Sequence, residues 1–255
     1  MRNYTIVAYF QPIYRFFTQK QSFKKYLSLV CSFYFIGIVL AFIVPYLTTK
    51  YNLPVDKSDL LVTIYNNYVY TQIPILSNSF LQIFSNNLTV ALTMLFIPTT
   101  IFFIVLKFFE FISIDDEYQN KVKFGCVIFV LLLTLANSFQ SFAKNDMFLF
   151  FNVMPFNTFL VTFLHGLLEI PIFILCLTSS LFLFDQISSL NFVDEERHDI
   201  KIKLSKIVKH AFFLILLCSV ILFIAAYIEC YITPQLIKQS MESYFLSNSI
   251  SIPLF

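Results

Sequence analysis

Apolar residues are gathered into five long blocks with polar segments between them. The blocks cover residues 27–47, 80–108, 124–143, 158–184 and 211–232. A helix of about 20 apolar residues crosses the roughly 30 Å hydrocarbon core of a bilayer, whereas a barrel strand shows only about 10 residues of alternating hydrophobicity. The pattern therefore predicts an all-α, polytopic transmembrane helical bundle with about five spanning helices, within residues 27–232.

The segments around these blocks predict shorter elements. Residues 1–26 mix aromatic and basic side chains, which indicates a cytoplasmic amphipathic arm whose helix lies in the membrane interface; a frayed lead-in to the first span is the alternative. Residues 185–210 place acidic residues before basic ones, the order that a helix dipole favours, and predict a short cytoplasmic helix. Pro234 is expected to end the fifth span and to leave residues 233–255 as an extracytoplasmic tail.

Composition agrees with a membrane protein. Hydrophobic residues make up 58% of the 255 and charged residues 13%, whereas soluble domains are about 25% charged. The five cysteines all lie in apolar segments without a C-x-x-C pair, so they are interpreted as small buried hydrophobic residues rather than disulfide or zinc ligands.

Basic residues are unevenly distributed between the connecting segments, which predicts the topology. Residues 1–26 and 185–210 hold five Lys or Arg each and residues 107–123 hold three, against four in the segments on the other side. Under the positive-inside rule the N-terminus is cytoplasmic and, with five spans, the C-terminus is extracytoplasmic. The outer connections 48–79 and 144–157 are expected to rest on or dip into the interface. We expect a multi-pass protein of the inner (cytoplasmic) membrane.

One carboxylate lies in the middle of an apolar block. Glu169 is about twelve residues into the fourth block, where an ionised carboxylate costs roughly 2.5–3.5 kcal/mol or more. His165 stands four residues earlier, on the same face of a helix, so a His165–Glu169 hydrogen bond is predicted, with Asn87 as the next candidate partner. The predicted buried polar network is completed by Asn86, Asn87 and Glu229, although Glu229 could instead snorkel towards water.

Three residues are predicted to shape helix packing near this network. Gly166 would let another backbone come close, and Pro171 would free a carbonyl near Glu169. Pro98 is expected to bend the long second span. A polar network of this kind either stabilises the contacts between helices or relays protons during transport.

Motifs for catalysis are missing from the sequence. There is no H-E-x-x-H, no G-x-S-x-G and no P-loop, and only three glycines occur. His165 and Glu169 supply two metal ligands where a zinc enzyme needs three. We therefore expect no enzyme activity, no cofactor, no metal and no nucleic-acid partner.

Three stretches resemble a known family. His165–Pro171 resembles the Pro-His-Gly-x-x-Glu-Leu signature of the stage II sporulation protein M family, Phe80–Ala91 its Phe-x-x-Ile-x-x-Asn-Asn helix start, and Ala225–Ile237 its Ala-Ala-x-x-Glu-x-x-x-x-Pro ending. The resemblance implies a non-catalytic multi-pass protein. Some such proteins hold cell-wall hydrolases together during sporulation engulfment, and others accompany ABC ATPases or circular-bacteriocin clusters in peptide export and immunity.

The leading hypothesis is a membrane subunit for peptide export or bacteriocin immunity beside a separate ABC ATPase. A scaffold for cell-wall hydrolases and a stand-alone proton-coupled transporter using Glu169 and His165 are the alternatives. Besides the lipid bilayer we expect protein partners, an ABC ATPase or an envelope enzyme; whether the chain also forms a homo-oligomer stays open. The residues predicted to dock a cytoplasmic partner are Glu195, Glu196, Arg197, Lys201 and Lys203.

Overall fold

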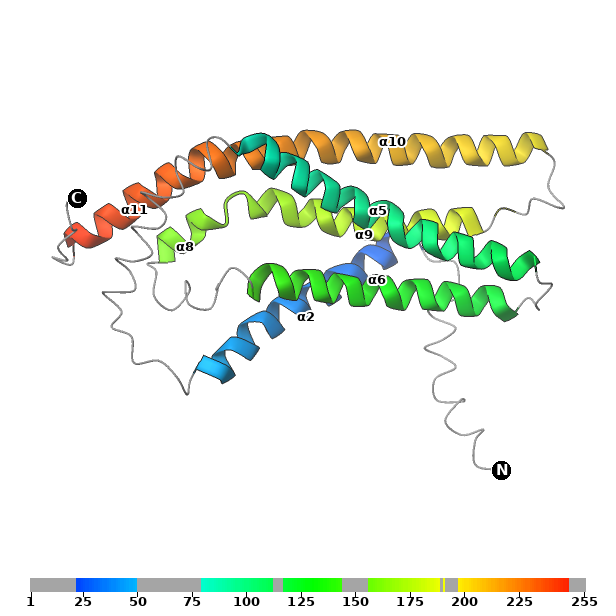
Figure 1. The fold of residues 1–255 in the computed structure, drawn as a ribbon, viewed down its shortest axis with the longest axis horizontal. Helices are drawn as coiled ribbons and strands as arrows, with labels where there is room; N and C mark the ends of the chain where they lie inside the picture. The colour runs from blue at the N-terminus through cyan, green and yellow to red at the C-terminus, as the bar shows by residue number, and fades with distance from the viewer. Residues whose placement is uncertain are drawn as a thin grey trace, which may run out of the picture. The chain divides into compact units, whose positions relative to one another are not determined.

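The computed structural model describes residues 22–49, 79–111, 117–143, 156–188, 190 and 197–247, and within these ranges all regular structure is helical. The predicted fold class is confirmed. Figure 1 labels the α-helices, which are α2 (Phe23–Thr49), α5 (Phe80–Phe111), α6 (Glu117–Ala143), α8 (Phe156–Thr162), α9 (Gly166–Ser188), α10 (Arg197–Tyr227) and α11 (Thr233–Ser247). A short π-helix, η2 (Ile228–Ile232), lies between α10 and α11.

Among the described residues, five stretches are long and apolar enough to cross a membrane, the number that the sequence predicts. They are Phe23–Ile43, Phe80–Phe108, Asn120–Gln140, Gly166–Ser188 and His198–Ser247. The first begins four residues before the predicted boundary, so the end of the N-terminal arm continues into α2. The rest of the predicted interfacial helix in the arm, and almost all of residues 48–79 and 144–157, lie outside the described residues.

The fourth apolar block is not one helix, which corrects the prediction for residues 158–184. α8 ends at Thr162, residues 163–165 form a turn, and α9 begins at Gly166. Within the turn the Phe163 and Leu164 amides donate to carbonyls three residues back, at 3.1 Å each. Glycine weakens a helix interior by about 1 kcal/mol relative to alanine, so Gly166 is a position where a break costs little.

The fifth block is longer than predicted, and Pro234 does not end it. α10 already begins at Arg197, so the short cytoplasmic helix predicted within residues 185–210 forms the first turns of the spanning helix. η2 and α11 then carry helical structure to Ser247, through the first part of the predicted tail. In η2 the Thr233 amide donates to the Ile228 carbonyl five residues back. This wider turn accommodates the proline ring, which otherwise clashes with a carbonyl four residues earlier.

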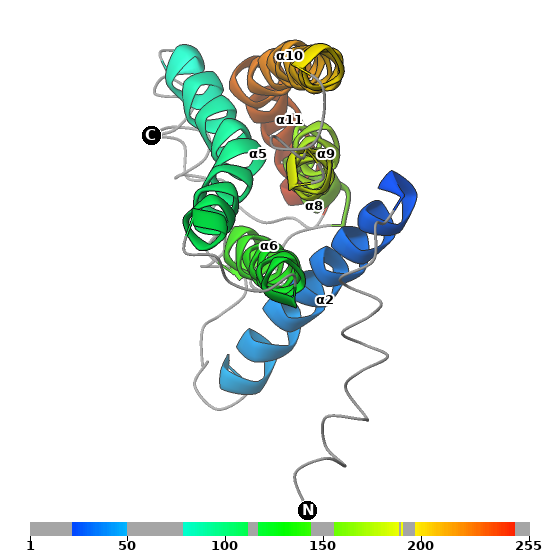
Figure 2. The same ribbon diagram turned by 90° about the vertical axis from the view of Figure 1, so that its right-hand side faces the viewer.

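The chain forms two compact units. Unit 1 contains residues 1–35, 91–136 and 173–216, and unit 2 contains residues 36–90, 137–172 and 217–255. In unit 1, α9 and α10 lie side by side (Figure 2) and Phe182 forms an edge contact with His210, with ring centroids 5.9 Å apart. Thr99 of α5 donates to the Ser180 carbonyl at 2.9 Å. Small side chains on α9 thus allow close helix packing with hydrogen bonds across the interface.

A buried ion pair links three helices of unit 1. Lys123 of α6 donates to Asp185 of α9, and the Tyr26 hydroxyl of α2 lies beside the same carboxylate. The side chains of Lys123 and Asp185 are only 12% and 4% exposed. Because a charge in a low-dielectric interior needs an opposite charge, this pair fixes the position of α6 against α9.

Unit 2 is held by aromatic contacts and by a hydroxyl pair. Phe80 and Phe84 of α5 pack edge-on against Phe223 of α10, with ring centroids 4.9 and 5.6 Å apart. Thr158 of α8 and Ser240 of α11 share a hydrogen bond of 2.7 Å. α8 therefore packs on α11, although it is too short to cross a membrane.

Asp185→Ala is expected to destabilise the protein by about 3–5 kcal/mol, because it leaves Lys123 charged, buried and without its partner. Unfolding in mild detergent, followed by circular dichroism, measures the effect. Asp199→Ala removes an exposed acid and serves as the control, with a change of less than about 0.5 kcal/mol. The double variant Lys123→Met/Asp185→Leu should recover most of the loss; equal stability of Asp185→Ala and wild type would contradict the role of the pair.

Candidate functional site: a polar cluster in unit 2

The side chain of Glu169 is hydrogen-bonded to a residue of another helix. It lies in the first turn of α9, where the positive end of the helix dipole favours a carboxylate. The side-chain amide of Asn87, in α5, donates a hydrogen bond to Glu169 Oε1. The second-choice partner from the sequence is therefore the one that the structure pairs with Glu169.

His165 does not take the predicted position beside Glu169 on a helix face, because it belongs to the turn between α8 and α9. Its backbone carbonyl accepts hydrogen bonds from the amides of Leu168 at 2.9 Å and Glu169 at 3.2 Å. Its Nδ1 atom is buried and has no hydrogen-bond partner among the described residues. The predicted hydrogen bond between the two side chains is thus replaced by backbone contacts that begin α9.

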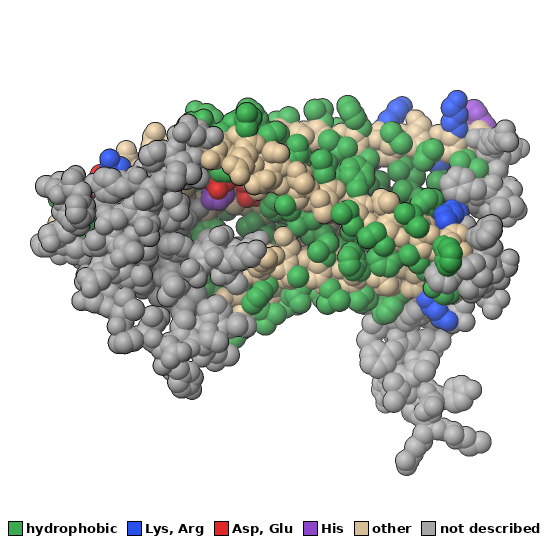
Figure 3. All heavy atoms as spheres, viewed as in Figure 1, with side chains coloured by type: hydrophobic (Ala, Val, Ile, Leu, Met, Phe, Trp, Pro, Cys, Tyr) green, Lys and Arg blue, Asp and Glu red, His purple; other side chains and the backbone are tan. Residues whose placement is uncertain are grey.

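Glu229 is the second acidic member of the cluster. It lies in the first turn of η2 and is half-buried rather than turned fully to solvent. Its carboxylate is close enough to that of Glu169 for their charges to interact. Figure 3 shows acidic side chains and a histidine together among apolar helices. Two interruptions of α-helical hydrogen bonding, the turn before α9 and η2, therefore occur at the residues that carry this cluster.

The other predicted site residues have simpler surroundings. Asn86 is exposed on α5 and does not join the cluster. Within the described part of the chain, a Cβ added to Gly166 would meet only the side chains of Phe163 and Ile170, at 3.8 and 3.9 Å, so no described backbone makes the predicted close approach. Pro171 and Pro98 lie inside the continuous helices α9 and α5; the bend predicted at Pro98 stays a prediction.

The predicted docking residues are described only in part. Arg197 begins α10, and Lys201 and Lys203 are exposed on its first turns. Glu195 and Glu196 lie outside the described residues. Docking of a partner here stays a prediction.

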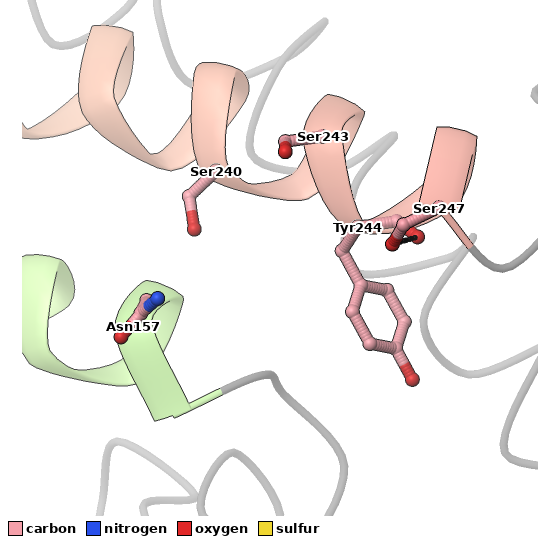
Figure 4. Close-up of a pocket in the computed structure, with 5 residues that line it drawn as sticks. All are labelled: Asn157, Ser240, Ser243, Tyr244 and Ser247. Carbon is pink, nitrogen blue, oxygen red and sulfur yellow. Dashed lines mark hydrogen bonds between the residues drawn. The ribbon is translucent and has the colours of Figure 1, made fainter.

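Unit 2 also contains an uncharged polar cleft between α8 and α11. Its volume is about 350 Å³, and its lining consists of Asn157, Ser240, Ser243, Tyr244 and Ser247. Figure 4 shows Asn157 of α8 and Ser240 of α11 on opposite sides of the space. Ser247 donates back to the Tyr244 carbonyl at 2.9 Å. This cleft was not predicted, because it depends on the packing of α8 against α11.

The polar cluster brings together groups that can form hydrogen bonds and exchange protons. No group of three or more His, Cys, Asp or Glu side chains among the described residues is placed to hold a metal ion, and the five cysteines, which are all described, form no disulfide with one another. The ion pair Lys123–Asp185 and its neighbour Tyr26 were not predicted either. Lys123 and Asp185 are charges next to apolar blocks, which gives no sign of a partner on another helix.

The five apolar stretches and the polar cluster between interrupted helices define a multi-pass helical membrane protein. A family model described as stage II sporulation protein M matches residues 27–234. The chain therefore belongs to the stage II sporulation protein M family, as the three sequence motifs indicated. No curated protein and no solved structure matches it.

Asn87→Ala is expected to lower stability by about 1 kcal/mol, the scale of hydrogen bonds between membrane helices, because Glu169 loses its donor. Asn86→Ala alters the adjacent exposed amide and is the matched control, with an expected change of less than about 0.5 kcal/mol. Unfolding in detergent by titration with a denaturing surfactant measures both. Equal losses in the two variants would contradict the specific pairing of Asn87 with Glu169.

Proposed function

We propose that this chain is a non-catalytic membrane subunit of an envelope complex that works in peptide export or self-immunity together with a separate ABC ATPase. The observation that supports this best is the exposure of the first turns of α10. His198, Asp199 and all residues of 201–205 are exposed. A charged helical segment that is widely exposed and continues into a membrane-spanning helix is suited to contact a soluble partner.

The surface of this segment combines charge with apolar contact area. Ile202 and Leu204 are 42% and 45% exposed, and they alternate with Lys201 and Lys203. Interfaces between proteins gain affinity from buried apolar groups and specificity from the charges around them. The sequence has no P-loop, so energy for export would come from the partner.

A second candidate function, proton-coupled transport by the chain itself, is favoured by one observation. α-Helical structure is interrupted at residues 163–165, shortly before Glu169, and at residues 228–232, which contain Glu229. Interrupted helices with acidic residues at membrane depth are typical of ion and proton sites in transporters. Under this hypothesis Glu169 exchanges a proton during transport.

Lys201→Glu/Lys203→Glu is expected to abolish recovery of an ATPase when the tagged protein is purified in mild detergent from its native cells, because both substitutions reverse the charge of the proposed docking segment. Lys238→Glu, an exposed lysine of α11, is the matched control and should retain the partner. Recovery of the wild-type protein alone would contradict the proposal, and recovery of a wall hydrolase instead would assign it to the scaffold role.

Glu169→Gln separates the second candidate from a structural role. If Glu169 carries a proton, the variant should express at the wild-type level but lose uptake driven by a pH gradient in proteoliposomes, because an amide cannot exchange the proton. If the variant instead lowers stability or loses its partner while the wild type shows no uptake, Glu169 is structural. Asn86→Gln, which keeps an amide at the exposed neighbouring position, should change neither result.

A further inference from the structure

Exposed lysines of unit 1 lie where apolar helix surface begins. Lys24 is in the first turn of α2, and Lys206 and Lys209 precede the apolar part of α10. All three are exposed, and none forms an ion pair with a described residue. Figure 3 shows Lys and Arg side chains gathered where α10 begins. The ammonium groups of these three lysines are therefore available to bind an anion.

Two ring contacts bring the lysine-bearing segments together. Phe182 of α9 packs edge-on against Phe23 of α2, at 5.7 Å between centroids, and against His210 of α10, at 5.9 Å. Lys24 directly follows Phe23, and Lys209 directly precedes His210. The three basic residues thus belong to segments that flank the same side chain of α9.

The sequence around these lysines contains no acid to neutralise them. Neither Lys206 nor Lys209 has an Asp or Glu three or four residues away, and the same is true of Lys24. Lys206 and Lys209 are themselves three residues apart, a spacing at which like charges destabilise a helix. The buried Nε2 atom of His210 also has no hydrogen-bond partner among the described residues. An anion bound here would relieve the repulsion.

The position along α10 indicates where the anion comes from. At about 1.5 Å per residue, Lys209 lies about 3 Å and Lys206 about 7.5 Å before Ala211, where the apolar run begins. A headgroup layer is roughly 5–7 Å deep, so both lysines lie at the level of phosphate groups. Lys201 lies about 15 Å away, beyond that layer. The exposed rings of Phe212 (67%) and Phe213 (61%) follow immediately and would contact acyl chains.

We propose that Lys24, Lys206 and Lys209 form a binding site for the headgroup of an anionic phospholipid. The phosphate is bound by the ammonium groups, and the acyl chains lie along the exposed apolar face of α10. By the positive-inside count these lysines belong to the cytoplasmic leaflet, which carries anionic lipid. This site is distinct from the proposed docking segment, whose lysines lie farther from the apolar run.

The test compares the lipids retained by the full chain after reconstitution into nanodiscs of equal parts phosphatidylglycerol and phosphatidylcholine, using native mass spectrometry. The wild type should retain phosphatidylglycerol preferentially. Each lysine at a membrane surface adds about fivefold to this affinity, so Lys24→Gln/Lys206→Gln/Lys209→Gln should reduce the preference by at least about tenfold. The corresponding triple arginine variant keeps the charge and should keep the preference.

Two further variants show whether the lipid preference belongs to these three lysines or to any exposed lysine. Lys238→Gln removes an exposed lysine of α11, and Lys201→Gln/Lys203→Gln removes the docking lysines; both should retain phosphatidylglycerol like the wild type. An unchanged preference in the triple glutamine variant would overturn the proposal, as would loss of the preference in the arginine variant. If the glutamine triple loses a co-purifying protein while its lipid is unchanged, the lysines bind protein instead.

Discussion

The hydrogen bond between Asn87 and Glu169 is the contact that gives the acidic side chain at the start of α9 a partner within unit 2. An ionisable group inside hydrocarbon is tolerated only when protein groups replace the water that it has lost. Glu169 receives an amide from α5, and the dipole of α9 favours its negative charge. Glu229 adds a second acidic group within electrostatic range. Two carboxylates within electrostatic range repel one another when both are ionised, and the amide donor and the helix end offset part of that repulsion.

In unit 1 the buried carboxylate is compensated by an ion pair. Asp185 is paired with Lys123 and lies beside Tyr26, yet its Oδ2 atom is buried without a hydrogen bond from the described residues. A buried pair of this kind adds little net stability, because the charges must first be desolvated. Its contribution is specificity: only one arrangement of α6 and α9 brings the two charges together. Each unit thus contains a polar contact between helices in which an ionisable side chain receives a partner from another helix.

The sequence predicted the architecture well because length and hydropathy decide whether a helix can cross a bilayer. It predicted the boundaries of α5 to within a few residues. It failed where backbone hydrogen bonding changes without a change in hydropathy. The turn at residues 163–165 lies within a long apolar run whose length and hydropathy do not mark a break, so the fourth block reads as one helix with His165 on its face. Pro234 was treated as a helix stop because the alternative, a π-turn ahead of the ring, leaves no mark in composition. The partners of Lys123 and Asn87 depend on which helices are neighbours. The hydrophobic periodicity of the sequence does not indicate those neighbours.

The π-helix η2 changes the geometry of the buried stripe that runs through it. In unit 2 the stripe recurs at every fourth position, from Cys218, Leu222, Ala226 and Cys230 to Pro234, Ile237, Met241 and Phe245 with one interval of three. Four residues turn an α-helix by about 400°, so such a stripe drifts about 40° around the axis at each step. A turn closed by a bond to the fifth residue back is underwound and rotates the stripe the opposite way. The π-turn therefore offsets the drift of the buried stripe. As a result the continuous helix keeps the same side towards its neighbours over a greater length than a uniform α-helix could.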